Sequence, residues 1–131
     1  MSEFLLYCWE GYEDPNILER FGERYGLTTR FENLTSDSEA ASRVLNGRSI
    51  NPSVLNINNP FPKKWLHPNN RILELDCEAL NTWKIGLLPW TRPLCEWAHS
   101  TSGKLIGIPQ RFGPFNFVIN TQRISRSVAE D

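Results

Sequence analysis

A strand–helix–strand pattern occupies the amino-terminal quarter of the chain and constrains the fold more than any other feature. Residues 4–9 are apolar at nearly every position, which is typical of a strand covered on both faces. A helix is predicted over 15–25, because Asp14 suits the N-cap and Gly26 suits the C-terminal stop. Residues 28–33 are rich in β-forming side chains and predict a second strand. Such a unit predicts two parallel strands joined by a right-handed crossover.

The predicted helix carries one apolar stripe that we expect to face the sheet. Its members recur at helical spacing and are Ile17, Leu18, Phe21 and Tyr25. Charged residues occupy the positions between them, so the opposite side of this helix is expected to face solvent.

The alternation of helices and strands continues along the chain. Ser36 and Glu39 form a capping-box pattern, which predicts a helix ending at Gly47. A third strand is predicted over 54–57 and a short helix over 63–66, closed by Pro68. Further extended segments are predicted over 72–76, 104–109 and 115–120, and further helices over 77–84 and 93–98. Residues 1–131 are therefore predicted to form a single α/β domain, a mostly parallel sheet flanked by helices.

Charge and hydropathy exclude several classes of function. The formal net charge is −1 and the basic residues form no stripe, so nucleic acid is not a predicted partner. No apolar run reaches the roughly 20 residues of a membrane helix. The run at 4–9 is too short for a signal-peptide core, and Glu3 stands where such a peptide carries positive charge.

Cysteine spacing and glycine loops give no sign of a cofactor. Cys8, Cys77 and Cys95 form no C-x-x-C motif, so a structural zinc site is not predicted. Free buried thiols are the favoured interpretation, and a Cys77–Cys95 disulfide is the alternative in an oxidising compartment. Neither the glycine-rich dinucleotide motif nor the phosphate-binding P-loop motif occurs.

Two constellations of reactive side chains have simpler structural interpretations. Cys95 and His99 stand four residues apart and could pair on a helix, but no third group is positioned to assist them. Glu74, Asp76 and Glu78 form an acidic cluster where a strand ends and a helix is predicted to start, a place where acids cap helices. We therefore predict no catalytic residue and no metal ligand.

Aromatic and amide side chains gather where three predicted strands end. They are Trp9 at the end of the first strand and Tyr12 in the loop after it, Asn58, Asn59 and Phe61 after the third strand, and Gln110, Arg111 and Phe112 after the strand over 104–109. Ligands of open parallel sheets bind outside the carboxyl ends of the strands. Flat aromatic faces beside a few polar groups suit a small polar or cationic ligand. The alternative is that Trp9 and Phe61 are core residues.

Several stretches, taken in order, resemble one family. They are Leu6–Tyr12, Leu18–Gly26, Val54–Phe61, Ile72–Asp76, Ile106–Gly113 and Val118–Asn120. Together they resemble the spermidine/putrescine-type family of periplasmic solute-binding proteins. The resemblance spans nearly the whole chain and rests on the order and spacing of the pieces.

The resemblance implies a receptor role. The fold would be the first lobe of a type II periplasmic binding protein, in which two α/β lobes close on a solute. The chain would be a non-enzymatic, periplasmic or extracellular component of an ABC importer. Its partners would be a small polar or cationic solute, such as a polyamine, and a membrane permease. A second lobe, or a second copy of the chain, would complete the cleft.

The resemblance also implies which residues touch the solute. Trp9 and Tyr12 would be ligand-contacting aromatics, Asn59 and Phe61 a second contact loop, and Arg111 and Phe112 would lie near the floor of the cleft. The chain departs from the family before the third strand, where Ser53 stands in place of the usual aspartate. Two alternatives remain open: an isolated lobe acting as an interaction module, and a small enzyme using Cys95 and His99.

Overall fold

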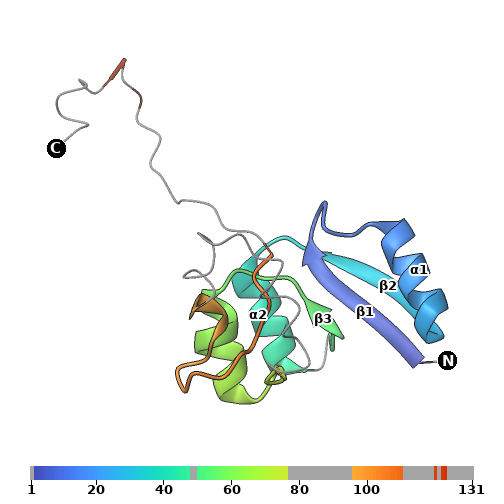
Figure 1. Ribbon diagram of the computed structural model, residues 1–131. Helices are drawn as coiled ribbons and strands as arrows, with labels where there is room; N and C mark the ends of the chain where they lie inside the picture. Colours follow the sequence, from blue (N-terminus) through green and yellow to red (C-terminus); the bar gives the residue numbers. More distant parts are fainter. Residues whose placement is uncertain (1, 48–49, 77–95, 111–119, 121, 124–131) are drawn as a thin grey trace.

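A parallel three-stranded sheet forms the centre of the amino-terminal part of the chain (Figure 1). The computed structural model describes residues 2–47, 50–76, 96–110, 120, 122 and 123. The strand order is β2-β1-β3, where β1 is Ser2–Trp9, β2 is Leu27–Leu34 and β3 is Val54–Leu55. The predicted parallel pair and the α/β class are confirmed.

Two helices connect these strands, and both begin and end where their caps predict. In α1 (Pro15–Tyr25), the Asp14 carboxylate accepts hydrogen bonds from two backbone amides of the first turn. In α2 (Asp37–Asn46), the Ser36 hydroxyl accepts one from the amide of Glu39 at 3.5 Å. Gly26 and Gly47 end the two helices in the left-handed conformation, with φ of 65° and 62°. Glycine adopts this conformation without the steric cost that a Cβ atom brings.

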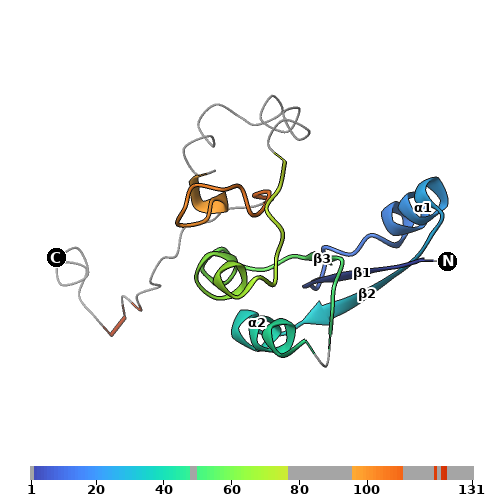
Figure 2. The ribbon, with the colours of Figure 1, turned by 90° about the horizontal axis from the view of Figure 1, so that it is seen from below.

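The two helices cover opposite faces of the sheet (Figure 2). Alternate residues of β1 point to opposite faces, so Leu5 and Tyr7 face α2 while Phe4 packs on Phe21 of α1, with ring centroids 4.8 Å apart. The larger core lies on the α2 side and consists of Leu5, Tyr7, Leu34, Ala40, Ala41, Val44, Ile50 and Leu66. The central position of β1 between these layers explains its continuous apolar sequence.

The apolar stripe predicted for α1 is only partly correct. Leu18 is buried as expected, but Ile17 and Tyr25 are 66% and 57% exposed. The helix instead approaches the sheet through Gly22, where an added Cβ atom would lie 2.8 Å from the carbonyl oxygen of Leu27. A glycine at this position allows the helix to lie close to β2, and this close approach turns part of the apolar stripe toward solvent.

The third strand is shorter than the predicted 54–57. Its flanking residues bond to β1, with the Ser53 amide donating to the Leu5 carbonyl at 2.9 Å and the Asn56 amide to the Tyr7 carbonyl at 2.8 Å. The two donors, Ser53 and Asn56, are three residues apart, whereas the two acceptors on β1, Leu5 and Tyr7, are two residues apart. The extra residue interrupts the regular hydrogen-bond pattern and limits β3 to two residues.

The helix predicted over 63–66 is a π-helix, Pro62–Leu66, followed by a 3₁₀ turn, His67–Asn69. Pro68 does not close it, because a proline in a first turn sacrifices no hydrogen bond. The segment ends at Asn70, whose φ is 54°.

The strand predicted over 104–109 is wrong in its extent. Leu105 forms an isolated antiparallel bridge with His99, and residues 106–110 form no strand. The expected extended segment 72–76 bonds to it through the Leu75 amide and the Leu105 carbonyl, 2.8 Å apart. Residues 96–98 form a 3₁₀ turn. The predictions for 77–84, for 93–95 and for 115–119 lie outside the described residues.

Candidate functional site

The carboxyl ends of β1 and β3 lie side by side and form the candidate site. The chain leaves β1 through α1 toward β2 on one side, and it later returns through α2 to β3 on the other side. The connections therefore diverge between β1 and β3. In open α/β sheets, such a switch point leaves a crevice at the carboxyl edge that commonly holds a ligand.

Asp37, the first residue of α2, joins the two strand ends. Its Oδ1 accepts a hydrogen bond from the indole Nε1 of Trp9 at 3.0 Å and another from the amide of Asn58 at 3.2 Å. Its Oδ2 accepts from the side-chain amide of Asn58 at 2.5 Å. We call Trp9, Asp37 and Asn58 the edge cluster. The carboxylate thus holds the end of β1 against the loop that follows β3.

No cation of the described residues neutralises the charge of the edge cluster. Among the described residues, Asp37 forms no ion pair. A carboxylate offers about four lone-pair positions, and three are occupied by Trp9 and Asn58. Within the part of the chain that the structure describes, the half-buried Asp37 therefore keeps one acceptor position and a formal negative charge at the carboxyl edge. A cation or an additional hydrogen-bond donor suits this position.

Trp9 and Tyr12 lie at the end of β1, as predicted. Trp9 is the last residue of the strand, is half-buried and packs against the core cluster. Tyr12 is half-buried in the loop that follows, and its amide donates to the Trp9 carbonyl at 3.3 Å. The ring of Trp9 packs on the core, which is the predicted alternative, and its indole N–H donates to Asp37.

Asn59 and Phe61 lie at the end of the loop that follows β3. Both are half-buried, and Phe61 packs against the core cluster and makes an edge-to-face contact with Trp65 at 5.3 Å between centroids. The Phe61 amide donates to the carbonyl of Asn58 at 3.2 Å, so this aromatic is linked to the edge cluster through the backbone. Arg111 and Phe112 lie outside the described residues. The ligand role of all six predicted residues stays a prediction.

Two residues of this edge escaped the sequence analysis. Asp37 lies within the capping-box pattern between Ser36 and Glu39, and Asn56 lies within the strand predicted over 54–57, and neither pattern predicts a role at this edge. The side-chain amide of Asn56 donates to Oε1 of Gln110 at 2.8 Å, which brings the segment ending at residue 110 to the end of β3. Of these two partners, Gln110 is the one that the sequence predicts at this edge. Asp37 is the first residue of α2, and this position at a helix start is the one sequence signal that points to it.

A buried tyrosine anchors α2 beneath the edge. The Tyr7 hydroxyl accepts from Nη1 of Arg43 at 3.0 Å, and the same nitrogen donates to Oε1 of Glu32 at 2.7 Å. The hydrogen bond to Glu32 raises the pKa of Arg43 above its ordinary value, so the guanidinium is charged at every relevant pH. This network is structural, because it satisfies a hydroxyl that is otherwise buried.

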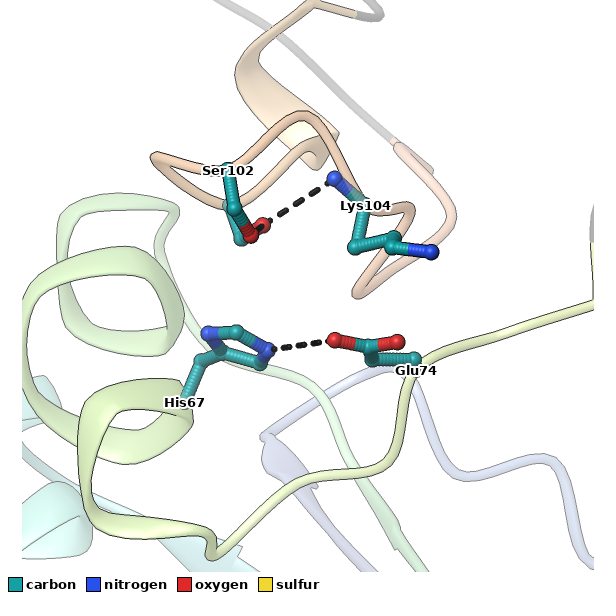
Figure 3. A network of polar contacts seen from close by, with 5 residues as sticks. His67, Glu74, Ser102 and Lys104 are labelled. Carbon is teal, nitrogen blue, oxygen red and sulfur yellow. Dashed lines mark hydrogen bonds and ion pairs between the residues drawn. The ribbon is translucent and has the colours of Figure 1, made fainter.

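Figure 3 shows two separate sets of polar contacts, one at the 3₁₀ turn His67–Asn69 and one within the loop that faces it. His67 Nε2 lies 3.4 Å from Oε1 of Glu74. On the facing loop, the buried Ser100 hydroxyl accepts from the amide of Lys104 at 3.1 Å and lies 2.9 Å from the hydroxyl of Ser102. Glu74 thus pairs with a histidine, and the helix start that it was predicted to cap lies outside the described residues. Asp76 takes part in another interaction, and Glu78 lies outside the described residues.

The thiol of Cys8 is not an activated nucleophile. Burial, together with the nearby Glu13 carboxylate, raises its pKa from 9.0 to about 11. Its Sγ lies 3.8 Å from Oε2 of Glu13. The free buried thiol predicted for this position is confirmed. Cys95 lies outside the described residues, so its predicted proximity to His99 stays untested.

Alkylation is expected to report the raised pKa of Cys8. At pH 8 the thiolate fraction falls about a hundredfold when the pKa rises from 9.0 to about 11. Cys8 should therefore resist iodoacetamide in the folded protein and react fully in urea, as followed by mass mapping of its peptide. The raised pKa also makes stability depend on pH, because the thiolate is disfavoured only in the folded state. The contribution of the protonated Cys8 thiol to the free energy of unfolding is present below pH 9 and is lost between pH 9 and about 11. Rapid labelling of folded protein would contradict this assignment.

The described residues contain no group of three or more His, Cys, Asp and Glu side chains able to hold a metal ion. Within the same residues, no helix has the length and apolar character that crossing a membrane requires. No protein-family model matches the chain, and a search of curated proteins gives no match.

Proposed function

We propose that this chain binds a small polar or cationic solute at the carboxyl edge of its sheet, as the first lobe of a two-lobed receptor for an ABC importer. The observation that carries the proposal is the edge cluster, in which Asp37 holds the Trp9 indole beside Asn58 between the ends of β1 and β3. The receptor role itself comes from the family resemblance. The proposal assigns binding to the chain and assigns no catalysis.

The chemistry of the edge favours an amine-bearing solute. A protonated amine gains from the negative charge of Asp37 and can donate to its remaining acceptor position. The ring of Trp9 adds a cation–π surface, which contributes about 0.5–1 kcal/mol when exposed and more when solvent is excluded. Asn59 and the Asn56–Gln110 pair supply amide groups for hydrogen bonds to polar parts of the solute.

The proposal includes a second lobe and a membrane partner. Closure of a second lobe over the edge would exclude water and strengthen each polar contact. A membrane permease would then receive the solute from the closed receptor. This assignment places the protein in the periplasm or outside the cell.

A panel of solutes, three of which share a four-carbon chain, tests the preference for positive charge. We expect 1,4-diaminobutane and spermidine to raise the melting temperature of the full chain, because a ligand at about a hundred times its Kd stabilises the folded state by about 2.7 kcal/mol. The neutral 1,4-butanediol and the dianion succinate serve as controls of similar length and should have little effect. Stabilisation by succinate alone, or an equal response to all four compounds, would contradict an acidic amine site.

A further inference from the structure

Strand β2 forms the rim of the sheet (Figure 2). Within the described residues it pairs with β1 on one side, and no strand lies on its other side. The backbone carbonyls of Leu5 and Tyr7 accept hydrogen bonds from the segment around β3. Because backbone groups alternate in direction along a strand, the N–H and C=O groups of Leu6 point the other way, toward β2. With Leu6 opposite Phe31, the backbone of Arg30 and Glu32 then faces β1. The backbone groups of Thr29, Phe31 and Asn33 point away from the sheet.

The side chains of β2 do not protect this edge. Phe31, at the middle of the strand, is 42% exposed and lines an open groove between α1 and β2 together with Leu18 and Leu27. Exposed edge strands invite pairing with another strand unless charges, proline or a bulge block it. On the opposite face, Arg30 and Glu32 carry opposite charges two positions apart.

We propose that a second copy of this chain pairs with β2 in antiparallel orientation, about a twofold axis that passes at Phe31. The two Phe31 residues then oppose each other and exchange backbone hydrogen bonds. Thr29 lies opposite the partner's Asn33, and Arg30 lies opposite the partner's Glu32. The two three-stranded sheets become one continuous six-stranded sheet. This inference concerns the opposite side of the sheet from β3 and is independent of the proposed solute site.

Charge complementarity favours a second copy of this chain as the partner of β2, and it favours one register of the two β2 strands. A twofold interface must be complementary to itself, and the sequence Arg30-Phe31-Glu32 meets this condition when Phe31 lies on the axis. An axis at Arg30 or at Glu32 would instead place two like charges opposite each other. An axis at Thr29 would leave both charges without an opposite partner across the interface.

The existing ion pairs are compatible with this arrangement. Arg30 uses its Nε to contact Glu3, and a guanidinium has further donors. Glu32 uses Oε1 to accept from Arg43, which leaves Oε2. Across the interface the charges then alternate as Glu3, Arg30, the partner's Glu32 and the partner's Arg43. The twofold axis creates two Arg30–Glu32 pairs in each dimer, so one substitution changes two cross-strand pairs and its effect on the dimerisation free energy is doubled.

A reciprocal charge exchange tests the proposal by sedimentation velocity across a range of protein concentrations. The wild type is expected to form a dimer. Arg30→Glu or Glu32→Arg alone should weaken the dimer by about tenfold or more, because each creates two like-charge pairs. The double variant R30E/E32R should recover the dimer. Both intramolecular ion pairs stay broken in the double variant, so a purely structural effect would not be rescued.

A second pair of variants separates edge pairing from general apolar contact. Phe31→Lys should abolish the dimer, whereas Ile17→Lys, which adds the same charge at an exposed apolar residue of α1, should leave it unchanged. Thermal melts of each variant report whether the fold is retained. A wild type that is monomeric up to about 1 mM overturns the proposal. A dimer that is insensitive to Phe31→Lys, or a double variant without rescue, overturns it as well.

Discussion

Replacing Gly22 with alanine is expected to lower the free energy of unfolding by about 1–3 kcal/mol, the cost of overpacking a close contact. The expected sign is unusual, because Gly-to-Ala inside a helix normally stabilises by about 0.5–1 kcal/mol. Here the new Cβ atom would lie 2.8 Å from the Leu27 carbonyl oxygen and 3.1 Å from a methyl carbon of Thr29. The carbonyl belongs to the backbone of β2 and cannot rotate away, so α1 must move from the sheet.

Urea unfolding followed by circular dichroism measures this effect. Gly107→Ala is the matched control, since a Cβ atom there meets nothing within 4 Å and the backbone is not left-handed. That control should be neutral or slightly stabilising, because alanine restricts the unfolded chain. If Gly22→Ala stabilises the protein as much as Gly107→Ala does, the close packing of α1 on β2 is wrong.

Replacing Asp37 with alanine is expected to destabilise the fold by about 1–3 kcal/mol, because three hydrogen bonds to a charged acceptor are lost at once. Half-buried Trp9 and the exposed Asn58 would then depend on water for their acceptors. Asp37→Asn keeps one oxygen and should lose less. The loss should appear both in urea unfolding and as a red shift of tryptophan emission.

The control for Asp37 is a second acid at the same helix start. Glu39→Ala removes an equal charge from the first turn of α2 and should cost only about 0.3–1 kcal/mol, the usual effect of the helix dipole. Equal destabilisation by the two substitutions would mean that Asp37 acts only through the helix, without joining β1 to the loop after β3.

The sequence predicts the first two helices and strands well because their signals are local. Asp14, Gly26, Ser36 and Gly47 fix the helix ends through contacts within one turn, and the structure reproduces all four boundaries. The continuous apolar run of β1 likewise predicts its central place between two layers.

Features that depend on distant partners were not predictable in this way. The burial of Gly22 rather than Tyr25 follows from the close approach of α1 to β2, which no helical periodicity encodes. The short β3 depends on one extra residue between Ser53 and Asn56 relative to β1. At the candidate site, the position of Trp9 followed from the strand end, but its bond to Asp37 spans 28 residues of sequence and appears only once α2 packs on the sheet.

The indole N–H resonance of Trp9 gives the most direct test of the solute-binding proposal. It can be assigned in a ¹⁵N–¹H spectrum as the signal missing from Trp9→Phe, and a diamine titration can follow it even at millimolar affinity. We expect this resonance to shift saturably with 1,4-diaminobutane, because the amine would bind the carboxylate that accepts the Trp9 hydrogen bond. Asp37→Asn should weaken that response at least about tenfold. A Trp9 resonance that does not move with any diamine, while the protein remains folded, would contradict solute binding at this edge.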